Sequence, residues 1–206
     1  MHALFIAFEG GEGAGKSTQE QRLAEHLTGF GHEVVRTREP GGTPAAEAIR
    51  GIVLSPEFAG LDARSEALLF AAARGEHAAR IIRPALERGA IVVCDRYLDS
   101  SVAYQGFGRD LGASTVRDLS LWATGGLTPD LTIVLDIDPV IGLSRITAPD
   151  RLEAEPLAYH KRVRAAFLEI AAGDSHRYLV LDATLSIDEI AVAIRKVVVA
   201  RLDGPR

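Results

Sequence analysis

Five short apolar runs, separated by longer amphipathic stretches, constrain this sequence most. The runs are nearly continuous rather than alternating, which is typical of parallel strands that are buried on both faces. They lie at Ala3–Phe8, Glu33–Thr37, Ile91–Cys94, Leu131–Asp136 and Arg177–Leu181. This alternation predicts an α/β fold in which a five-stranded parallel sheet is flanked by helices on both faces. In such sheets, ligands bind at the carboxyl ends of the strands.

The stretches between the runs carry helical patterns. The first is a stripe of Leu23, Leu27 and Phe30 that ends near Gly29–Gly31. A second stripe precedes Gly89 and consists of Leu68, Ala72, Ala79, Ile82 and Leu86. Near the end of the chain, Ser186 is a predicted N-cap with Glu189 as its capping-box partner. Three amphipathic helices are therefore expected to cover the sheet.

Length and composition limit the class of protein. A chain of 206 residues is long enough for one α/β domain, predicted to span residues 1–206. The formal net charge of −5 argues against a general nucleic-acid binder. No apolar run approaches the roughly 18 residues that span a bilayer, so no membrane contact is expected. The single cysteine, Cys94, allows no intrachain disulfide, and we expect a cytoplasmic protein.

A glycine-rich motif, G-x-x-x-x-G-K-[ST], lies directly between the first apolar run and the first helix. Glycines let backbone N–H groups turn inward around phosphate oxygens, and the following helix directs its positive end at the same anion. Lys16 is expected to reach the β- and γ-phosphates, and the Ser17 hydroxyl to bind Mg²⁺. The predicted ATP-binding residues of this loop are Gly10, Gly11, Glu12, Gly13, Ala14, Gly15, Lys16, Ser17 and Thr18.

The chain contains no asparagine, and this narrows the choice among phosphate-loop proteins. A Ras-type GTPase reads guanine with an Asn-Lys-x-Asp motif, and protein kinases use an asparagine for the second Mg²⁺. Both classes are excluded. A nucleoside monophosphate kinase of some kind remains, as does an ATPase or regulatory switch that transfers phosphate only to water.

Arginines stand next to turn residues or aromatic residues in three further segments, 38–43, 69–74 and 95–109. Asp95 ends a strand expected beside the phosphate-loop strand, a position suited to a carboxylate that holds Mg²⁺ or its water. Phe70 and Arg74 are four residues apart on one predicted helix face. A flat ring and a forked donor in that arrangement could stack on a base and hydrogen-bond to its edge. The three segments therefore indicate a nucleotide acceptor site.

With these motifs the sequence resembles bacterial thymidylate kinase over essentially its whole length. The motifs that carry the resemblance are F-E-G-G-E-G-A-G-K-S-T at 8–18, T-R-E-P-G-G-T at 37–43, D-R-Y at 95–97, S-x-x-A-Y-Q-G-x-G-R at 100–109, P-D-L-T-I-V-L-D at 129–136 and D-A-T at 182–184. The resemblance implies an enzyme that phosphorylates dTMP to dTDP with ATP and Mg²⁺ in dTTP biosynthesis, and that forms a homodimer by helix packing. A guanylate or cytidylate kinase is the nearest rival.

The resemblance also implies roles for residues of the acceptor pocket. Arg96 and Arg50 would hold the dTMP phosphate, and Phe70 would stack on thymine. The other implied contacts are Arg74 with thymine O4, Ser101 and Gln105 with the remaining polar edge, Tyr104 against C2′, Glu12 near the 3′-hydroxyl, and Glu39 with Pro40 at the pocket wall. In this interpretation the pocket selects both the base and the deoxyribose.

On the ATP side, the resemblance implies that Arg145 and the loop beginning at Asp182 flank adenine, and that residues 148–155 form a mobile lid. In this family, the catalytic arginine comes from the phosphate loop or from the lid. The variable loop positions, Gly11 to Ala14, carry no basic residue, so Arg151 is the predicted catalytic arginine. Lys16, Arg96 and Mg²⁺ would share the developing charge, with Glu12 also placed in the catalytic site. This lid is shorter and less basic than in many relatives.

Overall fold

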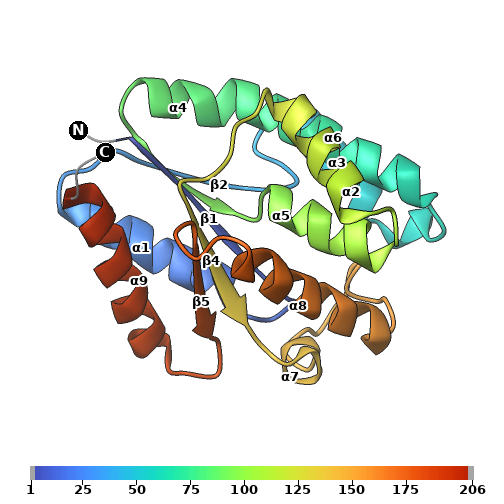
Figure 1. The fold of residues 1–206 in the computed structure, drawn as a ribbon. Coiled ribbons are helices and arrows are strands. Elements are labelled where there is room, and N and C mark those ends of the chain that lie inside the picture. The colour runs from blue at the N-terminus through green and yellow to red at the C-terminus, as the bar shows by residue number, and fades with distance from the viewer. Residues whose placement is uncertain (1–2, 204–206) are drawn as a thin grey trace.

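The computed structural model describes residues 3–203 and contains a five-stranded parallel sheet (Figure 1). The strands are β1 (Leu4–Gly10), β2 (Val34–Arg38), β3 (Ile91–Asp95), β4 (Leu131–Asp136) and β5 (Tyr178–Asp182). Their order across the sheet is β2-β3-β1-β4-β5, and all neighbouring pairs are parallel. Each strand falls on one of the five apolar runs, and its ends lie within two residues of the predicted ones. The predicted fold class is confirmed.

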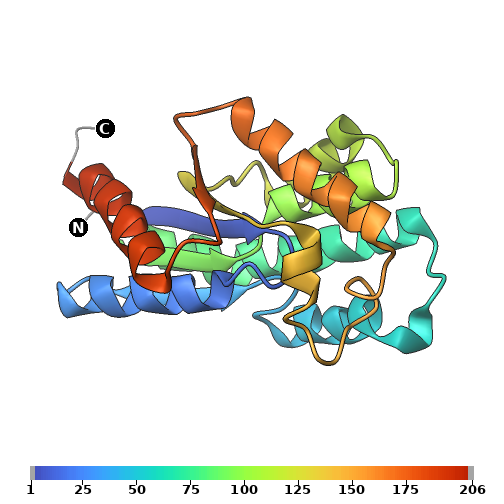
Figure 2. The ribbon, with the colours of Figure 1, turned by 90° about the horizontal axis from the view of Figure 1, so that it is seen from below.

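Helices cover both faces of this sheet (Figures 1 and 2). The α-helices are α1 (Lys16–Gly29), α2 (Pro44–Leu54), α3 (Ala63–His77), α4 (Arg83–Glu87), α5 (Leu98–Ser101), α6 (Ala113–Thr124), α7 (Pro139–Leu143), α8 (Leu157–Ala172) and α9 (Ile187–Asp203). Shorter helical turns are η1 (Pro56–Phe58), η2 (Ala78–Ile82) and η3 (Val102–Gly108), the last two of the π type. No helix within residues 3–203 is long and apolar enough to cross a membrane.

Alternate residues of β1 point to opposite faces of the sheet, and both sets are buried. Ile6 and Phe8 pack in a cluster with Leu23 of α1 and Ile190 of α9. Phe5, one position away from Ile6, packs instead with residues of α4 and α5. Because successive side chains of a strand alternate between faces, a strand covered on both sides is apolar at most of its positions. This explains the continuous apolar runs of β1, β3 and β4, whereas the edge strands β2 and β5 are partly exposed.

Hydrogen bonds from side chains fix where several helices begin. Thr43 caps α2 by accepting from the Ala46 N–H at 3.2 Å, with Pro44 as the first helical residue. The predicted capping box before α9 is confirmed: Ser186 Oγ accepts from the Glu189 N–H at 3.3 Å, and the Ser186 N–H donates to the Glu189 carboxylate at 3.0 Å. Such reciprocal bonds satisfy helix-end N–H groups that have no partner within the helix.

Two of the predicted apolar stripes are wrong in part. Phe30 is 74% exposed, because α1 ends one residue before it. On α3, Leu68 and Ala72 face solvent, as does Ala79 beyond it. The buried face of α3 instead carries charged and aromatic residues, namely Glu66, Phe70, Arg74 and His77. Their charges are satisfied by partners from other elements, so a hydrophobic pattern does not reveal this face.

Candidate active site

The turn between β1 and α1 depends on glycine at two positions. Gly10 and Gly13 have φ values of 131° and 66°, a region that side chains rarely adopt. A Cβ atom at Gly10 would collide with the Leu135 carbonyl, and one at Gly13 with the Gly142 carbonyl of α7. Figure 2 shows α7 next to this turn. The close packing of α7 therefore holds the loop in the shape that a phosphate-binding turn requires.

Lys16 begins α1, and its ammonium group bends back over the loop. Nζ donates to the carbonyl oxygens of Gly10 at 3.1 Å and Gly11 at 2.9 Å. Burial and the neighbouring Arg96 lower its pKa, while the carboxylates of Glu12 and Asp95 oppose this shift. A cation held in this way at a helix N-terminus can bind a phosphate group.

Ser17 and Asp95, the two predicted Mg²⁺ ligands, are in contact next to the carboxyl ends of the neighbouring strands β1 and β3. Ser17 Oγ donates to Asp95 Oδ2 at 2.8 Å, while Asp95 Oδ1 is buried and accepts no hydrogen bond from the described residues. Mg²⁺ binds hard oxygen ligands and keeps several of its sites for phosphates and water. Residues 3–203 contain no group of three or more His, Cys, Asp or Glu side chains that could hold a metal ion. The two residues fit a magnesium ion.

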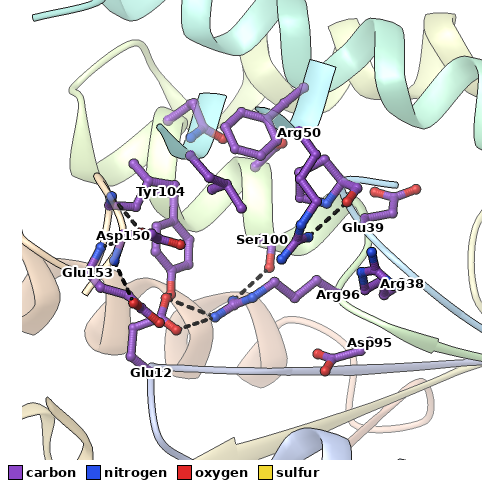
Figure 3. A pocket seen from close by; sticks show the side chains of 16 residues that line it. Glu12, Arg38, Glu39, Arg50, Asp95, Arg96, Ser100, Tyr104, Asp150 and Glu153 are labelled. Carbon is purple, nitrogen blue, oxygen red and sulfur yellow. Dashed lines mark hydrogen bonds and ion pairs between the residues drawn. The ribbon is translucent and has the colours of Figure 1, made fainter. Parts of the chain in front are cut away.

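A pocket opens beside the phosphate loop, at the carboxyl ends of β1, β2 and β3 (Figure 3). It brings together every predicted dTMP residue except Arg74: Glu39, Pro40, Arg50, Phe70, Arg96, Ser101, Tyr104 and Gln105, with Glu12 and Asp95. The rest of the lining consists of Arg38, Leu54, Ser100, Asp150, Leu152 and Glu153, of which the last three belong to the predicted lid and none had been given an individual role. The position of the pocket agrees with the rule for parallel sheets.

Arg96 lies at the centre of this pocket and has a positive φ of 69°, which is uncommon outside glycine. Its Nη2 donates to both carboxylate oxygens of Glu12, at 2.8 and 2.9 Å, and Nη1 donates to Ser100 Oγ at 3.1 Å (Figure 3). The Tyr104 hydroxyl donates to the same Glu12 carboxylate at 2.5 Å. Burial alone would raise the pKa of Glu12, but Arg96 and Lys16 outweigh it and lower the pKa to about 2.

Glu9 holds the backbone next to Arg96 in place, and no role had been predicted for it. The side chain is fully buried and accepts hydrogen bonds from the backbone N–H groups of Tyr97 at 2.8 Å and Ser100 at 3.0 Å. It thereby fixes the backbone on the carboxyl side of Arg96. Burial and the nearby Asp99 raise the pKa of Glu9 to about 7. In the sequence, the only indication of this role is that Glu9 is a single carboxylate directly after an apolar run.

Two more arginines approach the pocket from β2 and α2. Arg50 Nη1 donates to the Pro40 carbonyl at 2.9 Å, and no ion pair to Arg50 is found in the described part of the chain. Burial and the adjacent Arg38 lower the pKa of Arg50. Arg38 itself pairs with Glu47 at 3.0 Å. Because Arg50 and Arg96 line the same pocket, an anionic ligand there would relieve their mutual repulsion.

Arg74 is placed differently from the prediction. It is 1% exposed and lies behind the pocket, where Nε donates to Glu39 at 2.7 Å and Nη2 donates to Ser101 Oγ at 2.9 Å. Further hydrogen bonds join it to Ser120 and to the Tyr97 carbonyl. The buried Glu39 carboxylate requires a cation beside it, and Arg74 fills that need. In this structure Arg74 therefore reaches the pocket through Ser101.

In this structure Arg151 does not lie at the phosphate loop, where the prediction places it once the lid has closed. Its guanidinium is buried, pairing with Glu66 at 2.7 Å through Nη1 and donating to the Val53 carbonyl at 2.8 Å through Nε. It lines a separate cavity near η1 rather than the Arg96 pocket. The side chain points into the protein because it shares the buried Glu66 carboxylate with Arg109, and a buried carboxylate requires cations beside it.

Arg145 and Asp182 lie on the predicted ATP side. Arg145 Nη1 donates to the Gly13 carbonyl at 2.8 Å, so this exposed arginine does contact the phosphate loop. Asp182 ends β5, where its carboxylate accepts from the Thr184 N–H at 2.8 Å and shapes the loop before α9. The backbone of that loop is tied to β4 by a bond from the Ala183 N–H to the Asp136 carbonyl at 2.8 Å.

Comparisons with known proteins identify the family of this chain. A family model described as thymidylate kinase matches residues 8–194. The thymidylate kinase of Leifsonia xyli subsp. xyli is 55% identical over 205 residues, which cover 98% of this chain and 95% of the relative. That of Deinococcus radiodurans is 50% identical over 194 residues, covering 93% and 94%. The crystal structure of thymidylate kinase from Ehrlichia chaffeensis superimposes with a TM-score of 0.80 at 35% identity, covering 96% of this chain and 99% of that one. On these matches, the chain belongs to the thymidylate kinase family.

Proposed function

We propose that the pocket beside the phosphate loop is where this enzyme binds dTMP and transfers the γ-phosphoryl group of ATP to it. Membership of the family makes the chain a dTMP kinase of nucleotide biosynthesis. The single observation that carries the assignment of the site is the convergence of Arg96 and Arg50 next to a phosphate-binding turn. We also propose that residues 1–206 act as one kinase domain with residues 148–155 as its lid.

The reaction requires little of the protein besides position and charge. A dTMP phosphate oxygen is already anionic, so it attacks the γ-phosphorus in line without a strong general base. Arg96 and Arg50 would hold that phosphate, and Lys16 would hold the oxygens of ATP that gain charge. Glu12, now paired with Arg96, would accept a hydrogen bond from the 3′-hydroxyl and keep the arginine fork aligned.

Ser17 and Asp95 would hold Mg²⁺, which neutralises charge on the β- and γ-phosphates when bound. The unpaired Asp95 Oδ1 supports this assignment, because a buried carboxylate oxygen without a donor is costly unless a cation or its water occupies the place. Arg145 and the loop at Asp182 would flank the adenine ring.

The remaining pocket residues would recognise the acceptor nucleoside. Phe70 would stack on thymine, and Tyr104 would lie against C2′ and exclude a ribose hydroxyl. Ser101 and Gln105 would meet the polar edge of the base. Glu39 and Pro40 would form the wall on the side of β2.

The charge around the transferred group would come from Lys16 and Arg96, with Arg145 nearby, rather than from Arg151. Arg151 would have to leave Glu66 and the Val53 carbonyl to reach the loop, and Glu66 would then keep only Arg109 of the two arginines that pair with it among the described residues. In this account Arg151 anchors the lid to α2 and α3. Its side chain is only 5% exposed, in keeping with an anchoring role.

We further propose a homodimer formed through the exposed apolar stripe of α3. Leu68 is 57% exposed, and Ala72 lies one turn further along the same face. Leu68→Asp is expected to convert a dimer into a monomer in light scattering. The control is Val192→Asp on α9, which lies on the opposite side of the sheet. A monomeric wild type, or a Leu68→Asp variant that remains dimeric, would contradict this proposal.

The test of the function is an assay of ATP and Mg²⁺ with a panel of nucleoside monophosphates, in which each product is identified by chromatography. The expected result is dTDP from dTMP, with much lower turnover of dCMP, dGMP and dAMP. A guanylate or cytidylate kinase would prefer another member of the panel. ATP hydrolysis without any diphosphate product from the monophosphates would show a switch or ATPase instead.

A further inference from the structure

Glu66 is a fully buried carboxylate on α3, one helical turn before Phe70. Its Oε1 accepts from Gln105 Nε2 at 2.9 Å. Its Oε2 accepts from Arg151 Nη1 at 2.7 Å and from Arg109 Nη2 at 3.2 Å. An ionised carboxylate can only accept hydrogen bonds, so each of these partners must present a donor to it.

This requirement fixes the orientation of the Gln105 amide. Turning the amide over would place its carbonyl oxygen against the Glu66 carboxylate, with two acceptors facing each other in a buried site. Gln105 therefore keeps its NH₂ group on Glu66 and leaves Oε1 free. Gln105 lines the pocket, and its Oε1 accepts no hydrogen bond from any of residues 3–203. The pocket wall thus presents an acceptor at this position.

Ser101, four residues before Gln105, presents a hydrogen-bond donor to the pocket rather than an acceptor. Its Oγ accepts from Arg74 Nη2 at 2.9 Å, and a guanidinium cannot accept in return. Within the described residues the Ser101 hydroxyl donates to no other group, so its proton is free to point into the pocket that Ser101 also lines. A donor from Ser101 and an acceptor from Gln105 therefore lie on the same wall.

We propose that Glu66 is a positioning residue that sets the base specificity of this pocket by holding Gln105 with Oε1 toward the base. A donor and an acceptor on the wall match a pyrimidine that carries a C4 carbonyl beside N3–H. Cytosine presents the reverse, an amine beside an unprotonated N3, and would face two mismatched pairs. The proposal rests on the proposed function, because it takes this pocket as the dTMP site.

The test compares kcat/KM for dTMP and dCMP in the wild type and in Glu66→Gln. The ratio of the two values does not depend on the folded fraction, so a loss of stability alone leaves it unchanged. Because the new amide both donates and accepts, Gln105 is released, and the ratio is expected to fall by about tenfold or more. The matched control is Glu155→Gln, which weakens the 2.6 Å pair with Arg109 without touching Gln105 and should keep the ratio.

A second variant, Gln105→Leu, removes the acceptor itself. It should lower the same ratio, and adding Glu66→Gln to it should lower the ratio no further. An unchanged ratio in folded Glu66→Gln would overturn the proposal and leave Glu66 a structural ion-pair partner. Were Glu66→Gln unable to fold, an unchanged ratio in Gln105→Leu would overturn it equally. A wild type that makes no dTDP from dTMP would overturn the function instead, so the two failures are distinct.

Discussion

The acceptor pocket and the lid segment both carry arginines, but the structure uses them in opposite ways. In the pocket, Arg96 and Arg50 point toward the space that a ligand would fill, and buried groups such as Glu9 hold their supports in place. In the lid, Arg151 points into the protein and pairs with Glu66. The pocket is built before any ligand arrives, whereas the lid arginine already has a partner.

This difference indicates that an arginine side chain points toward the nearest carboxylate whose charge is not yet compensated. Arg96 has Glu12 beside it, yet both side chains line the pocket and remain 13–17% exposed. Glu66 is fully buried, and removing its partners would cost far more than leaving an exposed carboxylate alone. The Arg151 side chain therefore points into the protein, toward Glu66.

The largest effect on kcat is expected from a substitution at the phosphate loop, next to the acceptor pocket. Lys16→Met should lower kcat by about 10³-fold or more, because the variant removes a positioned charge from the transferred phosphoryl group. Steady-state kinetics with dTMP and ATP measure it. Lys196→Met, an exposed lysine of α9, is the control and should retain normal kcat. Turnover within a factor of about ten of wild type for Lys16→Met would contradict the assigned site.

The second prediction separates the two arginines of the segment between β4 and α8. Arg151→Ala should lower the free energy of unfolding by about 3 to 5 kcal/mol, because Glu66 loses a buried partner. Arg145→Ala, on the exposed side, should leave that free energy almost unchanged and lower kcat/KM for ATP about tenfold. Urea unfolding measures the free energy of unfolding, and steady-state kinetics measure kcat/KM for ATP. A stable Arg151→Ala variant with a kcat reduced more than a hundredfold would restore Arg151 as the catalytic arginine.

The third prediction concerns the pH dependence of stability at Glu9. Its pKa of about 7 in the folded protein lies above the ordinary value of 4.5, so between these values the folded state holds a proton that the unfolded state has lost. Stability contributed by Glu9 should therefore decrease as pH rises from about 4.5 to 7, by on the order of 3 kcal/mol in total. Urea unfolding of the wild type and Glu9→Gln across this range tests it. Parallel pH curves for the two proteins would show that Glu9 does not titrate there.

Much of the fold could be predicted because its signals are local. The five strands follow from continuous apolar runs, and the capping box at Ser186 follows from two residues three apart. The phosphate loop and the Ser17–Asp95 contact also follow, since adjacent parallel strands bring their carboxyl ends together. These features require only the spacing of residues along the chain.

Parts of the site could not be predicted, because they depend on which distant residue supplies a partner. Glu9 and Glu66 accept from residues about 90 and 40 positions away, and a pattern of apolar residues says nothing of such pairs. Arg74 was assigned to the base because a forked donor suits a base edge, and Arg151 to the transferred group because the family resemblance requires an arginine that the phosphate loop lacks. In this structure each pairs with a buried carboxylate. A useful signal lay in α3, where Glu66, Phe70 and Arg74 recur every four residues on one face.

The central claim is that the acceptor pocket is formed without help from the lid or from ATP. Isothermal titration calorimetry of dTMP into the nucleotide-free enzyme, with the wild type and Arg96→Met side by side, tests it most directly. We predict saturable binding of one dTMP per chain to the wild type and a loss of affinity of at least about tenfold in Arg96→Met. Binding of dTMP only in the presence of an ATP analogue, or equal affinity in the two proteins, would contradict the claim.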